Sequence, residues 1–312
     1  MSPGRVLVTG GAGFVGSHVC DAYLEAGWDV TAVDNLSTGR AANLSPEVRL
    51  VRLDIRDPQL SAAFREGKFD VVNHHAAQAS VRESVGNPRH DASVNLDGLL
   101  NVVGQSVKYG VQRFVLISSG GVVYGEPGQI PTPRTAPKRP LSPYGVSKLA
   151  SEYYMLAFSR LYGIGCATLR YSNVYGPRQR AGGEAGVAAI FMDGIRRGES
   201  LAVFGGGGQT RDYVFVSDVA AANLVVTGAD LPPPDDIDSV AFNVGTEVET
   251  SVLELARMAM ATVGRTVEVT PARPRDGELE RSALDCSETR ALGWTPETSL
   301  PDGLAQTWES MN

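Results

Sequence analysis

The stretch TGGAGFVG, residues 9–16, follows a short apolar run and opens an amphipathic helix pattern over 14–26. Gly10 permits a tight turn, Gly13 lets the backbone approach a pyrophosphate, and Gly16 allows a helix to pack closely on a strand. Spaced glycines also occur in ordinary turns, but the strand before them and the helix after them favour a dinucleotide-binding unit. The stretch therefore predicts a βαβ domain that binds a dinucleotide at its first turn.

Strand and helix patterns alternate along the first half of the chain. This alternation is typical of βαβ units and of a parallel sheet covered on both faces. We expect strands at 5–9, 30–33, 48–53, 71–72, 113–117 and 166–170, and helices at 14–26, 58–66, 88–109 and 144–161. The predicted fold class is α/β, a Rossmann-type doubly wound parallel sheet.

An acidic residue, Asp34, ends the second predicted strand, about 18 residues after Gly16, close to the roughly 20 expected for an acid that binds the adenosine ribose. A carboxylate there accepts hydrogen bonds from both ribose hydroxyls and repels a 2′-phosphate, so we expect NAD rather than NADP. Arg40, in the following loop, is the one feature that favours NADP. Two further strand ends fit the same cofactor: Asp54 with Ile55, and the run His75, Ala76, Ala77 and Gln78.

The alternation breaks down after about residue 172. Helix patterns then appear at 186–197, 217–228 and 251–263, with β-like runs at 201–204 and 213–216 and a Pro- and Asp-rich loop at 231–238. We predict an NAD-binding domain over 1–172, with late elements returning from about 209–245. Residues 173–312 would mainly form a smaller, interleaved C-terminal lobe that binds the substrate.

Composition excludes several classes of function. The net charge of −7 argues against a nucleic-acid partner, which would need a basic face. No apolar run approaches the roughly 18 residues of a membrane span, and no signal peptide precedes the first strand, so we expect a cytoplasmic protein. The histidines lack metal-ligand spacing, and the three cysteines, Cys20, Cys166 and Cys286, are expected to be buried packing residues.

A tyrosine and a lysine stand four residues apart in SPYGVSK, residues 142–148. On a helix, Tyr144 and Lys148 share one face. The ammonium group of Lys148 and the positive charge of a nicotinamide would both lower the pKa of the phenol from its usual value of about 10. We therefore expect Tyr144 to act as a base, with Lys148 also holding the nicotinamide ribose.

Together these motifs resemble the extended short-chain dehydrogenase/reductase family, and within it the UDP-glucose (UDP-galactose) 4-epimerase group. The resemblance runs from about Val6 to Trp308 and rests on TGGAGFVG, DNLSTG, HHAAQASVRESV, SSGGVVYGE, SPYGVSKLASE, LRYSNVYGPRQ and GGGGQTRDYVFVSDVA. It implies that tightly bound NAD removes hydride from C4 of a UDP-hexose and returns it to the other face after the 4-keto sugar turns over. Tyr144 would take the proton of the 4-hydroxyl.

The resemblance also implies site residues beyond the two motifs. Further cofactor contacts would come from Phe14, Val15, Asn35, Ser37, Gly39, Asn95, Ser118 and Tyr171. Substrate contacts would come from Ser119, Tyr144, Asn173, Val187, Ala202, Phe204, Arg211, Arg275 and Ser282. Ser282 aligns with a position where a small residue leaves room for an N-acetyl group, which would add N-acetylhexosamine nucleotides to the substrates.

The chain departs from the family in the run SSGGVVYGE, residues 118–126. The family usually has a serine or threonine where Gly120 stands, to bind the sugar 4-oxygen, and we expect Ser119 to replace it. A one-residue slip reverses the face of an extended strand, but the two glycines let the backbone turn. Family members that dehydrate or decarboxylate sugars carry acids here, so Gly120 and Gly121 favour epimerisation.

Two alternatives remain open. A UDP-glucuronate 4-epimerase would need a further cation at the sugar end, for which Arg82 and Arg281 are candidates. A non-catalytic NAD-binding protein of the same fold is disfavoured by the presence of both Tyr144 and Lys148. Helix patterns 88–109 and 144–161 carry more apolar residues than one sheet contact needs (Leu96, Leu100, Leu149, Tyr153 and Leu156), so we expect a homodimer.

Overall fold

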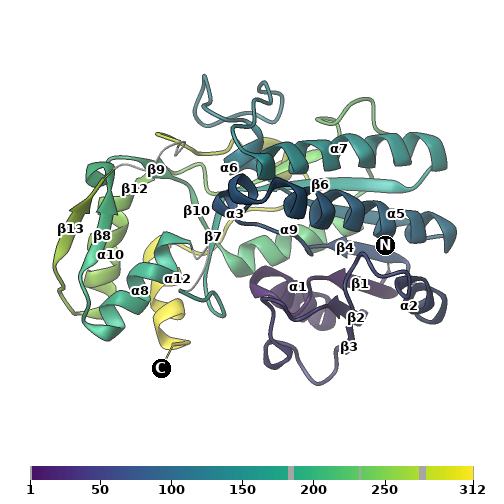
Figure 1. Cartoon of the computed structure of the whole chain (residues 1–312), viewed down its shortest axis with the longest axis horizontal. Coiled ribbons are helices and arrows are strands. Elements are labelled where there is room, and N and C mark those ends of the chain that lie inside the picture. Colours follow the sequence, from purple (N-terminus) through teal and green to yellow (C-terminus); the bar gives the residue numbers. More distant parts are fainter. Residues whose placement is uncertain (1, 182–185, 232, 274–278, 312) are drawn as a thin grey trace.

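The computed structural model describes residues 2–181, 186–231, 233–273 and 279–311. Figure 1 shows a large sheet-containing lobe beside a smaller lobe that holds β8, β13, α8, α10 and α12. The large lobe is built on a parallel sheet of seven strands in the order β11-β6-β5-β4-β1-β2-β3. This order confirms the predicted Rossmann-type fold, in which the strand order reverses between β1 and β4.

The strands of the main sheet lie where the sequence predicts them, with one addition. Their bounds are β1 Arg5–Thr9, β2 Asp29–Asp34, β3 Arg49–Arg52, β4 Val71–His74, β5 Arg113–Ser119, β6 Gly165–Tyr171 and β11 Ala241–Val244. The sequence pattern does not predict β11, whose four residues follow the Pro- and Asp-rich loop. Strand β11 pairs with β6 and completes the sheet.

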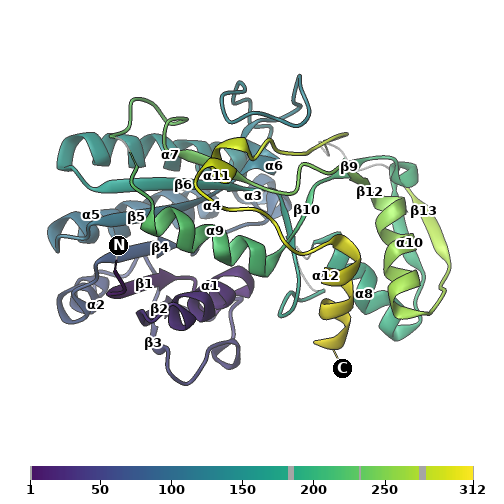
Figure 2. The ribbon, with the colours of Figure 1, turned by 180° about the vertical axis from the view of Figure 1, so that it is seen from behind.

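Helices cover both faces of the sheet. Side chains of one strand alternate between the faces: Leu7 of β1 packs with helix α5 Gly98–Lys108, whereas Val6 and Val8 pack with α1 Phe14–Glu25. Helices α2 Leu60–Gly67 and α7 Pro143–Tyr162 lie on the α5 side, and α9 Val216–Gly228 lies beside α1 (Figure 2). The TGGAGFVG turn joins β1 to α1 and so connects the sheet to the helix layer on one of its faces.

The predicted helix 88–109 is not a regular α-helix. It consists of α4 Pro88–Ala92, a π-helical turn η2 Ser93–Asp97 and α5. Short elements that the sequence patterns do not predict also occur before and after it, namely α3 Val81–Gly86 and α6 Gly120–Val123. A π-helical turn often marks a functional site, and this one contains Asn95.

The smaller lobe has its own apolar core. Strands β8 Leu201–Phe204 and β13 Val269–Ala272 pair in parallel. Helices α8 Val187–Arg197 and α10 Val252–Val263 pack against β8, and α12 Leu300–Glu309 packs against α10.

The last part of the chain returns to the large lobe before it ends in α12 (Figure 2). Leu284, Cys286 and Trp294 pack in the same core as β5 and β6. Helix α11 Ser287–Ala291 contacts β11. The two lobes are therefore interleaved in the sequence.

Other sequence expectations concern cysteines, metals and membranes. All three cysteines are buried and unbonded to one another. In the described part of the chain, no group of three or more His, Cys, Asp or Glu side chains could hold a metal ion. No helix among these residues is both long and apolar enough to cross a membrane.

Candidate active site

The glycines of the first turn are required by close backbone contacts. Gly10 has a left-handed φ of 67°, and a Cβ on it would lie 2.7 Å from the backbone nitrogen of Ala76 at the end of β4. A Cβ on Gly16 would lie 2.2 Å from the carbonyl oxygen of Gly10. Gly13 begins α1 without a side-chain cap, so backbone N–H groups of the first turn remain available to an anion.

The carboxylate of Asp34 is fixed at the end of β2. Its Oδ2 accepts a hydrogen bond from the Ala12 backbone nitrogen (3.0 Å), and its Oδ1 accepts one from Leu36 (2.7 Å). A Cβ on Gly39 would lie 2.9 Å from the same carboxylate, so the loop after β2 closes over it. Each oxygen has a second acceptor site for a ligand hydroxyl, as the prediction for Asp34 requires.

The end of the third strand offers less than predicted. Asp54 accepts two hydrogen bonds from the Arg56 guanidinium (2.8 Å each) and one from Asn35 (3.0 Å). These bonds, Arg56 first, hold the pKa of the Asp54 carboxyl well below its usual range. The Ile55 side chain is buried against Gly98, so Ile55 could meet a ligand only through its backbone. Ser37 lies in the loop that closes over Asp34.

The two histidines at the end of β4 are neutral; His74 is buried and His75 is half-buried. His74 pairs with the Thr9 hydroxyl (2.8 Å), and His75 lies 3.3 Å from the Tyr171 hydroxyl. Burial, with a smaller contribution from Lys148, lowers the pKa of each histidine to about 3. This favours packing roles over a catalytic histidine.

Beyond His75, the chain continues through Ala76 and Ala77 to Gln78. The Gln78 backbone exchanges two hydrogen bonds with the Asn95 side chain, both of 3.0 Å. The loop after β4 is therefore fixed to the π-helical turn.

Tyr144 and Lys148 lie on the buried face of α7, beside the end of β5. Helix α7 begins at Pro143, and its cap residue Ser142 accepts a hydrogen bond from Gly145. The Lys148 ammonium donates to the carbonyl of Ile117 (3.0 Å) and lies 5.8 Å from the Tyr144 ring centroid.

The protein alone does not lower the pKa of the Tyr144 phenol. Burial first, and the charge of Asp91 second, raise it above its usual value. Burial lowers the pKa of Lys148 to about 8, against the opposing effect of Asp91 and Glu152. The prediction of a lowered Tyr144 pKa rests on nearby cations alone. In the protein itself, desolvation of the phenol has the larger effect on this pKa and raises it.

The strand end at SSGG separates its two serines. The Ser118 hydroxyl donates to Glu152 of α7 (2.6 Å), so it is committed to a structural partner. Ser119 faces away from it, half-buried, and no hydrogen bond of its hydroxyl is found within the described ranges. Gly120 cannot take the role of a hydroxyl residue as the chain stands, because a Cβ on it would lie 2.5 Å from Leu284.

The predicted substrate residues other than Ser119 and Tyr144 come after the main run of βαβ units, in the smaller lobe and in segments that join the two lobes. Asn173 begins β7 Asn173–Tyr175, which pairs with β10 Tyr213–Phe215. The Arg211 guanidinium donates to the Thr210 carbonyl (2.7 Å). Val187 is the first residue of α8, Ala202 is exposed and Phe204 half-buried on β8, and Ser282 is buried. Arg275 lies outside the described residues.

Sequence reasoning missed the buried polar residues around the dyad. Glu152 lies four residues after Lys148, on the same helix face, and that spacing could have identified it. The charge of Asp91, on α4, contributes to the pKa shifts of both Tyr144 and Lys148. Leu284 could not have been paired with Gly120, because the two residues are far apart in the sequence and share no motif.

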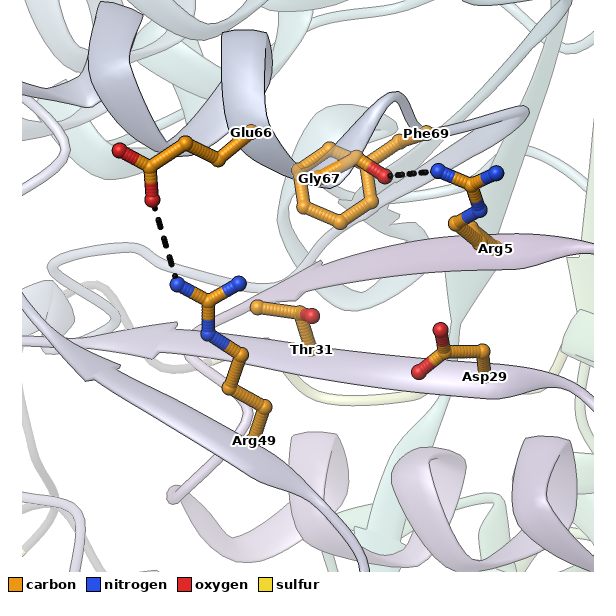
Figure 3. A pocket seen from close by; sticks show the side chains of 7 residues that line it. All are labelled: Arg5, Asp29, Thr31, Arg49, Glu66, Gly67 and Phe69. Atoms are coloured by element: carbon orange, nitrogen blue, oxygen red, sulfur yellow. Dashed lines mark hydrogen bonds and ion pairs between the residues drawn. The ribbon is translucent and has the colours of Figure 1, made fainter.

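A surface pocket at the opposite edge of the sheet is not part of this site. Figure 3 shows its lining by Arg5, Asp29, Thr31, Arg49, Glu66, Gly67 and Phe69. Arg5, Asp29 and Arg49 are the first residues of their strands, whereas TGGAGFVG follows the end of β1. In this pocket Arg49 forms an ion pair with Glu66 (3.4 Å), and Arg5 donates to the Gly67 carbonyl (3.1 Å).

Comparison with known proteins agrees with this geometry. The model of the NAD dependent epimerase/dehydratase family matches residues 6–245. The UDP-glucose 4-epimerase of Mycolicibacterium smegmatis is 43% identical over 311 residues, 98% of this chain and 97% of that protein. Two solved UDP-glucose 4-epimerases, each aligned over 98% of both chains, are similar: that of Thermotoga maritima with UDP-glucose (TM-score 0.94, 42% identity) and that of Thermus thermophilus with NAD (TM-score 0.92, 41% identity). The chain therefore belongs to the NAD dependent epimerase/dehydratase family.

Proposed function

We propose that this protein is an NAD-dependent 4-epimerase that interconverts UDP-glucose and UDP-galactose. The observation that carries the proposal is the buried Tyr144–Lys148 pair at the end of β5, beside a glycine-lined turn, in a chain whose relatives of that activity match it from end to end. The absence of an acidic side chain at Gly120 and Gly121 supports epimerisation over elimination.

The residues around the first turn fit NAD. Gly10, Gly13 and Gly16 leave a cradle that side chains would fill, and the adjoining helix end favours a diphosphate. The fixed carboxylate of Asp34 suits two ribose hydroxyls and would repel a 2′-phosphate. The backbone nitrogen of Arg40 donates a hydrogen bond to the Ala12 carbonyl, whereas its side chain is exposed. We therefore assign the three glycines of the first turn and the Asp34 carboxylate to NAD.

The chain's own groups manage the proton and the orientation of the sugar. NAD, when bound, accepts hydride from sugar C4 and returns it. Tyr144 takes the proton of the 4-hydroxyl and gives it back; the cations of Lys148 and nicotinamide must overcome the effect of burial on its pKa. Ser119, whose hydroxyl is not engaged by a described residue, binds the 4-oxygen from the strand side.

We assign UDP binding to the smaller lobe and the segments that join it to the large lobe. Asn173, Val187, Arg211 and Arg275 would contact the diphosphate, since a guanidinium suits phosphate geometry, and Ala202 and Phe204 on β8 would read the uracil. The proposed division is an NAD-binding domain over 1–172, with returning elements from about 209–245, and a mainly substrate-binding lobe over 173–312. Within the latter range, the segment around α11 packs on the large lobe.

The sugar end favours neutral hexoses. Arg281 forms an ion pair with Glu249, and Arg82 is exposed at the start of α3, so neither is held ready for a uronate carboxylate. Ser282 is small and lies two residues from Leu284, which packs on the strand end that carries Ser119. This placement supports the hypothesis that N-acetylhexosamine nucleotides are also accepted.

The decisive experiment is conversion of UDP-glucose to UDP-galactose, with the products resolved by chromatography. We expect Tyr144→Phe to lower kcat by about 10²–10⁴-fold, the usual contribution of a general base, with an unchanged circular dichroism spectrum. Tyr153→Phe, on the exposed face of the same helix, is the matched control and should keep wild-type activity. Wild-type protein that binds NAD without epimerising UDP-glucose would favour the non-catalytic alternative, and UDP-N-acetylglucosamine left unchanged would exclude N-acetyl acceptance.

The same assay tests Ser119. If Ser119 binds the 4-oxygen, Ser119→Ala should lower kcat more than it changes KM, because the bond matters most while the proton moves. An unchanged kcat would remove Ser119 from the catalytic residues and leave Tyr144 to act without it.

A further inference from the structure

A fully buried carboxylate, that of Asp91, lies under the proposed catalytic pair. Asp91 is on α4, which packs against α7, and its exposed fraction is 0%. Its Oδ1 accepts hydrogen bonds from Gln78 Nε2 (2.8 Å) and Asn95 Nδ2 (3.1 Å), and its Oδ2 accepts one from the Ser147 hydroxyl (2.5 Å). All of these direct partners are neutral donors.

The three donors come from three different parts of the site. Gln78 follows β4 in the loop assigned to the cofactor, Asn95 lies in the π-helical turn, and Ser147 lies on α7 between Tyr144 and Lys148. A single carboxylate therefore joins the helix that carries the catalytic pair to the loop that borders the dinucleotide. Removing the Asp91 carboxylate would leave three buried donors without their acceptor.

The negative charge of Asp91 is not balanced by a direct ion pair among the residues that the structure describes. A buried carboxylate without such a partner is costly to keep ionised. Asp91 from α4 and Glu152 from α7 favour the charged form of Lys148, whereas burial opposes that form. The histidines His74 and His75 also face Lys148, and both are neutral.

We propose that Asp91 is a positioning residue for the Tyr144–Lys148 pair, which ties α7 to the cofactor loop and holds the Lys148 side chain as an ammonium ion. The proposal rests on the proposed epimerase function for its kinetic consequences only. Asp91 also disfavours ionisation of Tyr144, which faces Asp91 and Lys148. Bound NAD, whose nicotinamide is a cation, would oppose this effect.

The direct test measures Lys148 itself. The chain has four lysines, Lys68, Lys108, Lys138 and Lys148, so carbon-13 labelling of lysine Cε gives few resonances, and Lys148→Arg assigns the one of interest. In the wild type we expect Lys148 to titrate near pH 8. In Asp91→Asn the titration should move to lower pH by about one unit, the size of effect that a nearby charge exerts. Asp97→Asn, an exposed residue of the π-helical turn, is the matched control and should leave it in place.

The kinetic test separates the charge from the tether. Asp91→Asn should lower kcat about 10-fold or more and move the acid limb of the kcat–pH profile to lower pH, because loss of a negative charge favours ionised Tyr144. Ser147→Ala keeps the charge of Asp91 but removes its hydrogen bond to α7. This variant should therefore lower kcat and leave the acid limb of the kcat–pH profile unmoved. If Asp91→Asn does not fold, Ser147→Ala still tests the hydrogen bond between Asp91 and α7.

Three outcomes would overturn the proposal: a Lys148 titration unchanged in Asp91→Asn, a lowered kcat with an unmoved acid limb in that variant, or full activity in Ser147→Ala. Failure of the wild type to epimerise UDP-glucose would refute the proposed function alone, since the resonance of Lys148 reports on Asp91 without any substrate.

Discussion

Position 120 is a glycine because the side chain of Leu284 occupies the space that a Cβ would need. A Cβ at this position would lie 2.5 Å and 2.7 Å from the two methyl carbons of Leu284. Leu284 is 1% exposed and belongs to the core formed by β5 and β6. Its segment is held in register by Thr132, which bonds to the Ala283 carbonyl and to the Asp285 nitrogen. The absence of a hydroxyl at position 120 is therefore explained by packing. Since the Ser118 hydroxyl is bonded to Glu152, Ser119 carries the other hydroxyl of the strand end.

This packing predicts a coupled pair of substitutions. Gly120→Ser should lower the free energy of unfolding by about 1–3 kcal/mol, the usual cost of overpacking a core. Gly121→Ser is the matched control, because a Cβ there meets nothing closer than the Ser119 hydroxyl at 3.8 Å. Leu284→Ala alone should cost about 2–5 kcal/mol, and in the double variant the two losses should not add. Additive losses in urea unfolding would show that Gly120 and Leu284 do not share this space.

The buried histidine His74 predicts acid sensitivity. Its pKa is about 3 in the folded protein, mainly because of burial, and about 6.5 in an unfolded chain. Between these values the unfolded state binds more protons, so stability falls as the pH falls below about 6.5. The loss for one such histidine is about 2 kcal/mol at most between pH 7 and pH 5. His74→Gln should reduce that loss in urea unfolding; an equally steep decrease in the variant would assign it to other groups.

At the scale of elements, the sequence predicts what its periodicity encodes. The strands and helices around TGGAGFVG are confirmed because each repeats a clear pattern of apolar residues. The π-helical turn Ser93–Asp97 is missed because it keeps the apolar face of the helices beside it. Strand β11 is missed because it is short and follows a loop, and it is defined only by pairing with β6.

The polar connections between elements are also invisible in the sequence. Arg170 of β6 is fully buried, and its guanidinium bonds to Glu152 of α7, to Asp238 in the loop before β11, and to the Tyr124 hydroxyl. Each residue alone is an ordinary member of its strand, helix or loop. Only tertiary structure brings the four side chains together and joins α7, which carries Tyr144 and Lys148, to the sheet.

Breaking this connection should be costly. Arg170→Met would leave Glu152 buried without its cation, whereas Asp238 would keep its ion pair with Lys138. The free energy of unfolding should therefore fall by about 3–5 kcal/mol. The matched control is Arg196→Met on α8, whose surface ion pair with Asp193 should contribute less than about 1 kcal/mol. Adding Glu152→Met to Arg170→Met should restore part of the loss. If Arg170→Met and Arg196→Met have the same midpoint of urea unfolding, the buried Arg170–Glu152 pair does not stabilise the fold.

At the scale of the molecule, the exposed face of α7 supports the predicted homodimer. Tyr153 is 56% exposed and Leu161 72% exposed, and Val146, Tyr154 and Tyr162 are also exposed on this helix. The opposite face of α7 carries Tyr144 and Lys148 and packs on β5 and β6. The other residues expected at this contact, Leu96, Leu100, Leu149 and Leu156, are half-buried. A monomer would leave these large apolar side chains of α7 in water, whereas a second copy of α7 would cover them.

We propose the homodimer on this basis, and it predicts how charge on α7 changes the assembly. The wild type should sediment at twice the chain mass of 33.1 kDa. The double variant Tyr154→Arg and Leu161→Arg should sediment at the chain mass, because like charges would meet across the contact. Val248→Arg, at an exposed apolar residue outside α7, is the matched control and should remain a dimer. A wild type at the mass of one chain would contradict the homodimer, and a variant that stays dimeric would place the contact on another surface. Since Tyr144 and Lys148 face away from this contact, the monomeric variant should keep the Tyr144-dependent activity of the wild type.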